Sequence, residues 1–336
     1  MKKIELFETC SRIPICQIPL EAFPGFWTYA YLVMHEEFKV LIDTGSGFGE
    51  SKDQLVKGID VAGKSIQGDT FSLSDLTHIL ITHGHVDHFG GLSEICSRTD
   101  ALVGVHELDR RNLTSFHERR TINLHKLSDY LIGAGVNGEK RESMLDFYRI
   151  TMQLFNSVDV DFGYEEINMQ LGPFRFLHVP GHSGGHVVIR LDDILFCGDH
   201  ILTDITPHQA PEQLSSWCGL YHYLRSLKLV EQWAGDVQMA LCGHKRVITD
   251  LPARILEIRD MHMDRLEEVL LFFRSPNTVE ALSGSLFGEA NGFNALLAIE
   301  EAGAHVEYLY QRGMLTIENY DQLEGSNGPV VLNYQA

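Results

Sequence analysis

The feature that most constrains this 336-residue chain is the run at residues 82–91, Thr-His-Gly-His-Val-Asp-His-Phe-Gly-Gly. It brings three imidazoles and one carboxylate close together in the sequence, directly after the apolar residues 79–81. Side chains two positions apart in an extended strand share a face. A strand followed by a tight turn would therefore present His83 and His85 together, with Asp87 and His88 behind them on a loop or a first helical turn. We predict a cradle for a metal ion, which becomes dinuclear if further ligands come from elsewhere.

Three later segments share one layout, in which an apolar strand ends in a polar residue framed by glycine. They are residues 179–186, 196–200 and 241–244. These segments contribute His182, Asp199 and His244. We expect the strand ends to converge at one edge of a sheet, because the neighbouring glycines permit tight turns and close approach of the backbone.

The combined set contains five imidazoles and two carboxylates: His83, His85, Asp87, His88, His182, Asp199 and His244. Three histidines with one open position are a common catalytic site for a divalent ion. Asp87, His88 and His244 can hold a second ion, and the two oxygens of Asp199 allow it to bridge both. Nitrogen and oxygen ligands of this kind suit zinc, iron or manganese. We therefore predict two divalent metal ions, with zinc as the first choice and Fe or Mn as alternatives.

The order of these motifs resembles the metallo-β-lactamase superfamily. The series runs from Asp43 through His-x-His-x-Asp-His to His182, Asp199 and His244, and it covers residues 10–250. The resemblance implies an α/β fold, a four-layer αββα sandwich in which two β-sheets face each other and helices lie outside.

The resemblance also implies a role for each ligand. His83, His85 and His182 would hold metal 1. Metal 2 would be held by a second set: Asp87, His88 and His244. Asp199 would be shared between the ions, and Asp43 would support the ligand loop without touching a metal.

The predicted enzyme is a metal-dependent hydrolase. Two cations that share a water lower its pKa and supply a bridging hydroxide, and they also polarise the oxygen under attack. Asp87 is the predicted catalytic residue, because it could orient the nucleophile and pass a proton to the leaving group.

Asp199 at the bridging position matches the glyoxalase II, lactonase, phosphodiesterase and RNA-cleaving branches better than true β-lactamases. The interval from Asp199 to His244 is too short for the extra domain of the β-CASP RNA-processing enzymes. We predict hydrolysis of a small ester, thioester or lactone. The alternatives are a phosphodiesterase or endoribonuclease of the same superfamily, and a non-catalytic metal-binding sensor with a partner-binding winged module.

The predicted organisation is a catalytic domain at residues 1–250, with a helical insertion or lid at 107–157, and a second module at 251–336. Three helices followed by two short strands, at 313–317 and 330–332, predict a winged-helix-like module. It resembles the tail of the β-lactamase-like-protein-2 subgroup, which includes an endoribonuclease. Residues 251–336 carry five Lys and Arg against thirteen Asp and Glu, so this module is a poor surface for nucleic acid.

Composition bears on partners and compartment. The formal net charge is −19, so we expect a small-molecule substrate and no nucleic acid. No apolar run reaches the ~20 residues of a membrane span, and the first residues do not read as a signal peptide. Six cysteines without CxxC spacing favour reduced thiols in a cytoplasm.

The apolar stripe of residues 254–273 allows a homodimer. The predicted substrate-binding residues are His200, His208 and Tyr221.

Overall fold

The computed structural model describes residues 2–336, which form two compact units. The first unit contains the described residues up to Phe116 together with Phe155–Pro207 and Ser226–Ile255. The second contains His117–Leu154, His208–Arg225 and Leu256–Ala336. Residues 117–154 therefore group with the C-terminal residues. The domain boundary at residue 250 and the lid role of 107–157 stay predictions.

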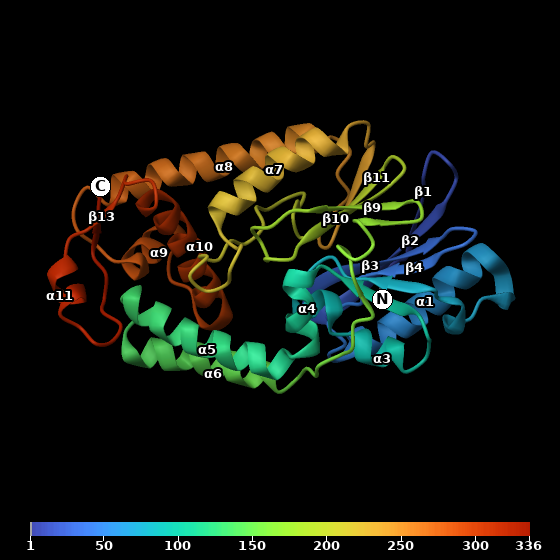
Figure 1. Cartoon of the computed structure of the whole chain (residues 1–336), viewed down its shortest axis with the longest axis horizontal. Helices are drawn as coiled ribbons and strands as arrows, with labels where there is room; N and C mark the ends of the chain where they lie inside the picture. Colours follow the sequence, from blue (N-terminus) through green and yellow to red (C-terminus); the bar gives the residue numbers. More distant parts are fainter. Residues whose placement is uncertain (1) are drawn as a thin grey trace. The chain divides into compact units, whose positions relative to one another are not determined.

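The first unit contains a seven-stranded sheet whose strands follow one another in chain order (Figure 1). They are β1 (Glu5–Glu8), β2 (Pro14–Phe23), β3 (Phe26–Met34), β4 (Lys39–Ile42), β5 (His78–Leu80), β6 (Leu102–Val105) and β7 (Phe162–Gly163). Strands β1 to β4 are antiparallel, and β4 to β7 are parallel. The carboxyl ends of β4, β5 and β6 therefore lie at the same edge.

A five-stranded sheet in the same unit has the order β12-β11-β10-β9-β8. Its strands are β8 (Gln170–Leu171), β9 (Phe174–His178), β10 (Val187–Leu191), β11 (Ile194–Gly198) and β12 (Met239–Cys242). Strands β11 and β12 are parallel, whereas the other neighbours are antiparallel. Two metal-ligand candidates, Asp199 and His244, directly follow this parallel pair.

The side chains of β4 point alternately to the two faces of the larger sheet and show what each face packs against. Val40 and Ile42 belong to a buried cluster shared with Phe176 and Ile189 of the smaller sheet, whereas Leu41 faces a second cluster that includes Ile59 of α1 (Glu50–Gln67). Because successive side chains of a strand point to opposite faces, one face of the larger sheet packs on the other sheet and the opposite face packs on helices.

Helices cover the outer faces of both sheets. Those of the first unit are α1, α2 (Val86–Phe89), α3 (Leu92–Cys96) and α4 (Glu107–Thr114), with the short 3₁₀ turns η1 (Gly68–Thr70) and η2 (Leu73–Asp75). The part of α7 (Leu220–Ala234) that lies in this unit covers the smaller sheet, where the Arg175 guanidinium lies 5.6 Å from the Trp233 ring centroid. The predicted αββα sandwich is confirmed.

The second unit is mostly helical. It contains most of α5 (Phe116–Gly133) and α8 (Leu251–Phe272), and also α6 (Gly138–Met152), α9 (Val279–Phe287), α10 (Gly292–Tyr310), α11 (Tyr320–Glu324), β13 (Thr316–Ile317) and β14 (Tyr334–Gln335). Helix α10 packs on α6 and α9. None of the described helices is long and apolar enough to cross a membrane.

Three boundaries differ from the sequence prediction. The proline and glycine residues of the segment 19–25 predict a turn, but residues 19–23 continue β2. The sequence at 212–233 predicts one helix, but α7 begins only at Leu220. The second wing strand was expected at 330–332, but the strand that pairs with β13 is β14. The apolar triplet Val-Val-Leu was a misleading signal, because pairing is decided by long-range contacts such as the bridge between Asn277 and Tyr334. The winged-helix assignment stays a prediction.

Two buried histidines lie at the centre of the second unit. Nδ1 of His262 lies 3.1 Å from Nε2 of His305, and Nδ1 of His305 donates to the carbonyl of Glu301 at 2.8 Å. The Glu301 carboxylate is paired with Arg265 at 2.7 Å, and the ring of Tyr223 contacts His262 edge-on. Each imidazole is fully enclosed, so protonation would place an unhydrated charge in this core.

We expect His262 and His305 to lower the stability of the second unit in mild acid. Burial lowers the pKa of His262 to about 2 and that of His305 to about 4. The unfolded chain takes up protons below ~6.5, so the stabilisation is present above that pH and is lost as the pH falls toward 4. His305 alone should remove about 2 kcal/mol between pH 6.5 and 5. Urea unfolding of wild type and His305→Gln at both pH values tests this, and an equal pH dependence in the two proteins would contradict it.

Candidate metal centre

Four strand ends bring the predicted ligands to one place in the first unit. After β5 the chain continues to His83 and turns at Gly84, and His85 then caps the amino end of α2. Asp87 and His88 lie on this helical turn, as the sequence predicts. His182 follows β9. Asp199 follows β11 and His244 follows β12, the two parallel strands of the smaller sheet.

The first ligand set consists of three histidines whose nitrogen atoms lie within 4.8 Å of one another: His83, His85 and His182. The rings are arranged edge to face, with centroids 4.7 Å apart for His83 and His85 and 4.6 Å apart for His85 and His182. His83 is fully buried, whereas His85 is partly exposed. The site therefore has a closed side and an open side.

The second ligand set contains Asp87, His88, Asp199 and His244, and their ligand atoms also lie within 4.8 Å of one another. Nε2 of His244 lies 3.3 Å from Oδ2 of Asp87 and 3.1 Å from Oδ2 of Asp199. Nε2 of His88 lies 3.4 Å from Oδ1 of Asp199.

Asp199 lies between the two sets. Its Oδ2 atom is 3.1 Å from His244 and 3.8 Å from Nε2 of His182, which belongs to the first set. Its backbone N–H donates to Nε2 of His186 at 3.1 Å. One carboxylate thus reaches both ligand sets, which is the geometry required of a bridging ligand.

The hydrogen-bond pattern of the imidazoles fits metal ligation. Nδ1 of His83 donates to Oγ1 of Thr82, Nδ1 of His88 donates to Asp43, and Nδ1 of His244 donates to the carbonyl of Trp27. Each Nε2 then faces the cluster as a potential ligand atom, and those of His83 and His88 are buried without a hydrogen-bond partner. Buried nitrogen acceptors of this kind are costly unless a cation or donor occupies the space between them.

The Asp43 carboxylate supports the second ligand set. Its Oδ1 accepts the backbone N–H of Thr82 at 2.8 Å, and its Oδ2 accepts both the Thr82 hydroxyl and Nδ1 of His88 at 2.8 Å. The backbone N–H of Thr44 also holds the carbonyl of His88 at 2.7 Å. Asp43 has a φ of 57°, a conformation that Asp and Asn tolerate better than most residues.

The charges of the cluster are strongly coupled. Burial raises the pKa of Asp87, but the neighbouring His88 and His244 lower it to about 2. Burial lowers the pKa of His244, but Asp199 and Asp87 raise it to about 10. The carboxylates are thus ionised, and a bound cation would replace the protons that they hold on the imidazoles.

The family model of the metallo-β-lactamase superfamily matches residues 25–244, which is more than half of the chain and contains every residue of both ligand sets. The chain belongs to this superfamily. Its members are hydrolases, and the histidine and aspartate cluster described above is suited to divalent metal ions.

Three curated relatives are similar over parts of their length. A metallo-β-lactamase fold-containing protein of Sulfurisphaera tokodaii is 29% identical over 54% of this chain and 59% of the relative. An atrochrysone carboxyl ACP thioesterase of Aspergillus fumigatus is 25% identical over 80% of this chain and 50% of the relative. A hydroxyacylglutathione hydrolase of a Shewanella species is 29% identical over 46% and 52%. The chain thus spans only half to three fifths of these relatives.

One solved structure is similar to the protein described here over almost its full length. It is a metallo-β-lactamase family protein from Thermus thermophilus, with a TM-score of 0.71 and 22% identity. The likeness covers 96% of this chain and 98% of that one. At this identity it shows that the two proteins share the fold.

Two residues near the two ligand sets were not assigned a role from the sequence. The ring of Phe26 lies 4.7 Å from that of His244, and the buried carboxylate of Asp109 in α4 contacts two ligand loops. His186, four residues after His182, stacks on His83 with ring centroids 4.6 Å apart. Only the position of His186 near a ligand motif gave any signal.

The three predicted substrate-binding residues of this superfamily member lie in different surroundings. His200 follows Asp199 directly and is fully buried, and its pKa is lowered to about 3 by burial. His208 and Tyr221 lie in the second unit, where Nε2 of His208 is 3.2 Å from the carbonyl of Leu297. Contact of these residues with substrate stays a prediction.

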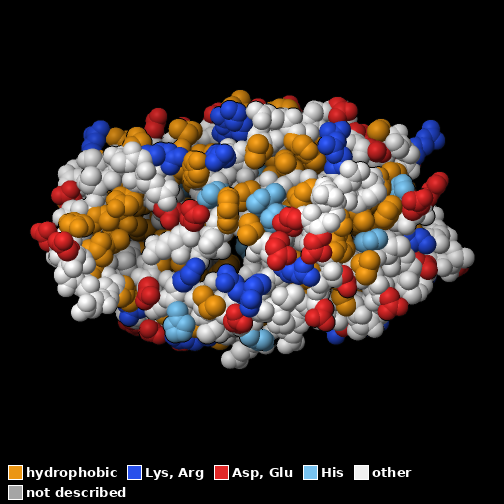
Figure 2. Space-filling view, viewed as in Figure 1, with side chains coloured by type: hydrophobic (Ala, Val, Ile, Leu, Met, Phe, Trp, Pro, Cys, Tyr) orange, Lys and Arg blue, Asp and Glu red, His pale blue; other side chains and the backbone are white. Residues whose placement is uncertain are grey.

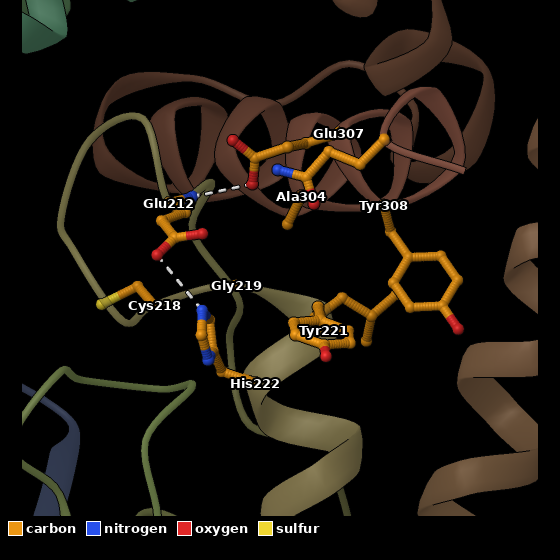
Figure 3. Close-up of a pocket in the computed structure, with 10 residues that line it drawn as sticks. Glu212, Cys218, Gly219, Tyr221, His222, Ala304, Glu307 and Tyr308 are labelled. Atoms are coloured by element: carbon orange, nitrogen blue, oxygen red, sulfur yellow. Dashed lines mark hydrogen bonds and ion pairs between the residues drawn. The ribbon is translucent and has the colours of Figure 1, made fainter. Parts of the chain in front are cut away.

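Tyr221 lines a small pocket of the second unit (Figure 3). Figure 3 also shows the hydrogen bonds of the acidic residues that line this pocket. The N–H of Glu212 donates to the Glu307 carboxylate at 2.8 Å, and the Glu212 carboxylate lies 3.1 Å from Nε2 of His222. The Tyr221 hydroxyl accepts from Arg225 at 3.0 Å. These polar groups are thus hydrogen-bonded to residues of the same unit.

Proposed function

We propose that this protein is a dinuclear metal-dependent hydrolase that acts on a small acyl substrate, with thioesters as the first class and esters and lactones next. The observation that carries the proposal is the position of Asp199, whose oxygens reach His88, His182 and His244 and so link the two ligand sets.

The residues would divide as follows. Metal 1 would be held by His83, His85 and His182, and metal 2 by Asp87, His88, Asp199 and His244. When bound, two divalent ions supply a nucleophile from water at neutral pH and polarise the oxygen that is attacked. Zinc is the first choice for this donor set, and iron or manganese is compatible with it.

Asp87 is proposed as the catalytic residue of this chain. It is partly exposed, in contrast to the fully buried His88 beside it. With its pKa lowered to about 2, the carboxylate is ionised at neutral pH and can accept a hydrogen bond from the attacking water. The same oxygen can then carry a proton to the leaving group.

Two observations support an acyl substrate. The relatives that carry an activity in their names are a thioesterase and a hydroxyacylglutathione hydrolase. The net charge of −19 opposes binding of a polyanion such as RNA. On the face shown in Figure 2, Lys and Arg side chains lie in separate groups among acidic and hydrophobic ones.

We expect the purified protein to contain about two divalent ions per chain and to hydrolyse at least one thioester in a panel that also holds esters, lactones, a phosphodiester and RNA. A chelator should abolish the activity, and zinc, iron or manganese should restore it. Metal content is measured by elemental analysis. Hydrolysis of the phosphodiester or RNA alone would overturn the acyl assignment, and activity that survives complete metal removal would overturn the metal-dependent mechanism.

A further inference from the structure

A buried carboxylate ties together the two loops that carry the histidines of the first ligand set. Oδ2 of Asp109 accepts the backbone N–H of Gly84 at 2.7 Å and the hydroxyl of Ser183 at 3.0 Å. Gly84 lies between His83 and His85, and Ser183 directly follows His182. A single oxygen atom thus holds both parts of the three-histidine set.

Asp109 is held in place by its own helix. Only 1% of its surface is exposed. It lies in the first turn of α4, which His106 caps through a hydrogen bond from the N–H of Leu108. Its second oxygen, Oδ1, accepts the side-chain amide of Asn112 at 3.1 Å. The orientation of the carboxylate is therefore supported from within α4 as well as by the loops that it joins.

Both loops approach Asp109 closely at a glycine, and at Gly185 no larger residue fits without a shift. A Cβ atom at Gly84 would lie 3.1 Å from Cγ of Asp109, and one at Gly185 would lie 2.7 Å from both Cγ and the backbone nitrogen. Real Cβ atoms essentially never approach within 3.0 Å of another heavy atom, so an alanine at Gly185 would displace the loop or the helix. The glycines of the ligand motifs therefore provide room for this carboxylate.

Asp109 corresponds to Asp43 on the other side of the cluster. Asp43 fixes His88 and the backbone of Thr82, and so supports the second ligand set. Outside its own helix, Asp109 accepts hydrogen bonds from residues next to the ligands of the first set. The two sets thus have different buried carboxylates, although Asp43 also reaches His83 through the Thr82 hydroxyl.

We infer that Asp109 is a positioning residue for metal 1, which it serves by holding the loops of residues 83–85 and 182–185 at the spacing that ligation requires. The inference rests on the proposed dinuclear centre. It predicts that loss of the carboxylate weakens binding of one ion selectively, because a partner outside the ligand set typically contributes 10–100-fold to metal affinity.

The test compares Asp109→Ala with Leu113→Ala. Leu113 is a buried residue of the same helix, and its truncation destabilises α4 without removing a bond to either loop. Metal affinities are measured by competition with a chromophoric chelator. In Asp109→Ala we expect one of the two ions to bind about 10–100-fold more weakly, whereas Leu113→Ala should keep both affinities. Asp109→Asn, which retains one acceptor oxygen, should fall between them and serves if the alanine variant does not fold.

Cobalt-loaded protein shows which ion is lost. Metal 1 has three imidazole ligands, and metal 2 has two, His88 and His244. The paramagnetically shifted imidazole N–H signals should therefore fall from five to two in Asp109→Ala. Unchanged affinities, equal weakening of both ions, or the same effect in Leu113→Ala would overturn the inference.

A second readout does not require metal. Hydrogen exchange of the backbone at residues 82–88 and 180–186 should be faster in Asp109→Ala than in Leu113→Ala. If wild type binds no metal, the proposed function fails, and this comparison still decides the role of Asp109. Equal exchange in the two variants would show that the carboxylate does not hold the loops.

Discussion

Replacement of Asp87 by Ala is expected to abolish turnover almost completely. The substitution removes a proposed ligand of metal 2 and the group that would orient the nucleophile and carry the proton. A positioned acid or base contributes about 10²–10⁴-fold to a rate, so kcat/KM should fall by at least this factor. Steady-state kinetics on the best thioester, together with metal analysis of the same samples, measures both effects.

The control for Asp87→Ala is Asp204→Ala. Asp204 is also in the first unit, but it is exposed and its partner, Arg246, is exposed as well. This variant should keep wild-type rates and metal content. Full activity in Asp87→Ala with both metals retained would remove the catalytic role of Asp87. Asp87→Asn should remain defective, because a neutral amide cannot accept and return the proton.

Replacement of Asp43 by Ala is expected to have the second-largest effect. Three donors would lose their acceptor: the backbone N–H of Thr82, its hydroxyl and Nδ1 of His88. Each buried donor left without a partner costs about 1–3 kcal/mol, and the ring of His88 would no longer be held. We expect a large loss of unfolding free energy and about 10–100-fold weaker binding of metal 2.

The backbone conformation at Asp43 requires its own control. Asp192 also has a positive φ, 51°, in the turn between β10 and β11, where its carboxylate accepts the Thr9 hydroxyl. Asp192→Ala should destabilise the protein but leave both metal affinities unchanged. Asp43→Asn tolerates the same φ and retains one acceptor, so it should recover much of the stability while metal 2 still binds weakly. Recovery of both quantities in Asp43→Asn would show that the ionised carboxylate is not needed.

Most of the metal centre could be predicted because its ligands occur in short motifs at the ends of apolar strands. The spacing of His83 and His85 and the glycine-framed positions of Asp199 and His244 are local features. The structure brings these residues into the two expected sets. The four-layer sandwich that the resemblance implies has a sheet buried on both faces, as the two clusters around Val40 and Leu41 show.

The errors occur where local patterns are weak. Apolar residues 330–332 read as a strand, but pairing in the second unit places β14 a few residues later. The segment at 212–219 has polar and apolar residues at helical spacing, yet α7 begins only at Leu220. In both cases tertiary contacts outweigh a modest intrinsic preference.

The sequence alone identifies the candidate ligands, their order and the superfamily, because each candidate lies in a motif that a few residues define. Only the tertiary structure decided what holds those ligands in place. Asp109 is 25 positions from Gly84 and 74 from Ser183, and the partner of His244 is a backbone carbonyl, that of Trp27. Neither leaves a signal in a single sequence, since a distant contact has no local spacing and every residue has a carbonyl. The cluster at residues 82–91 thus specifies the chemistry, and folding supplies the carboxylates and carbonyls that make its geometry.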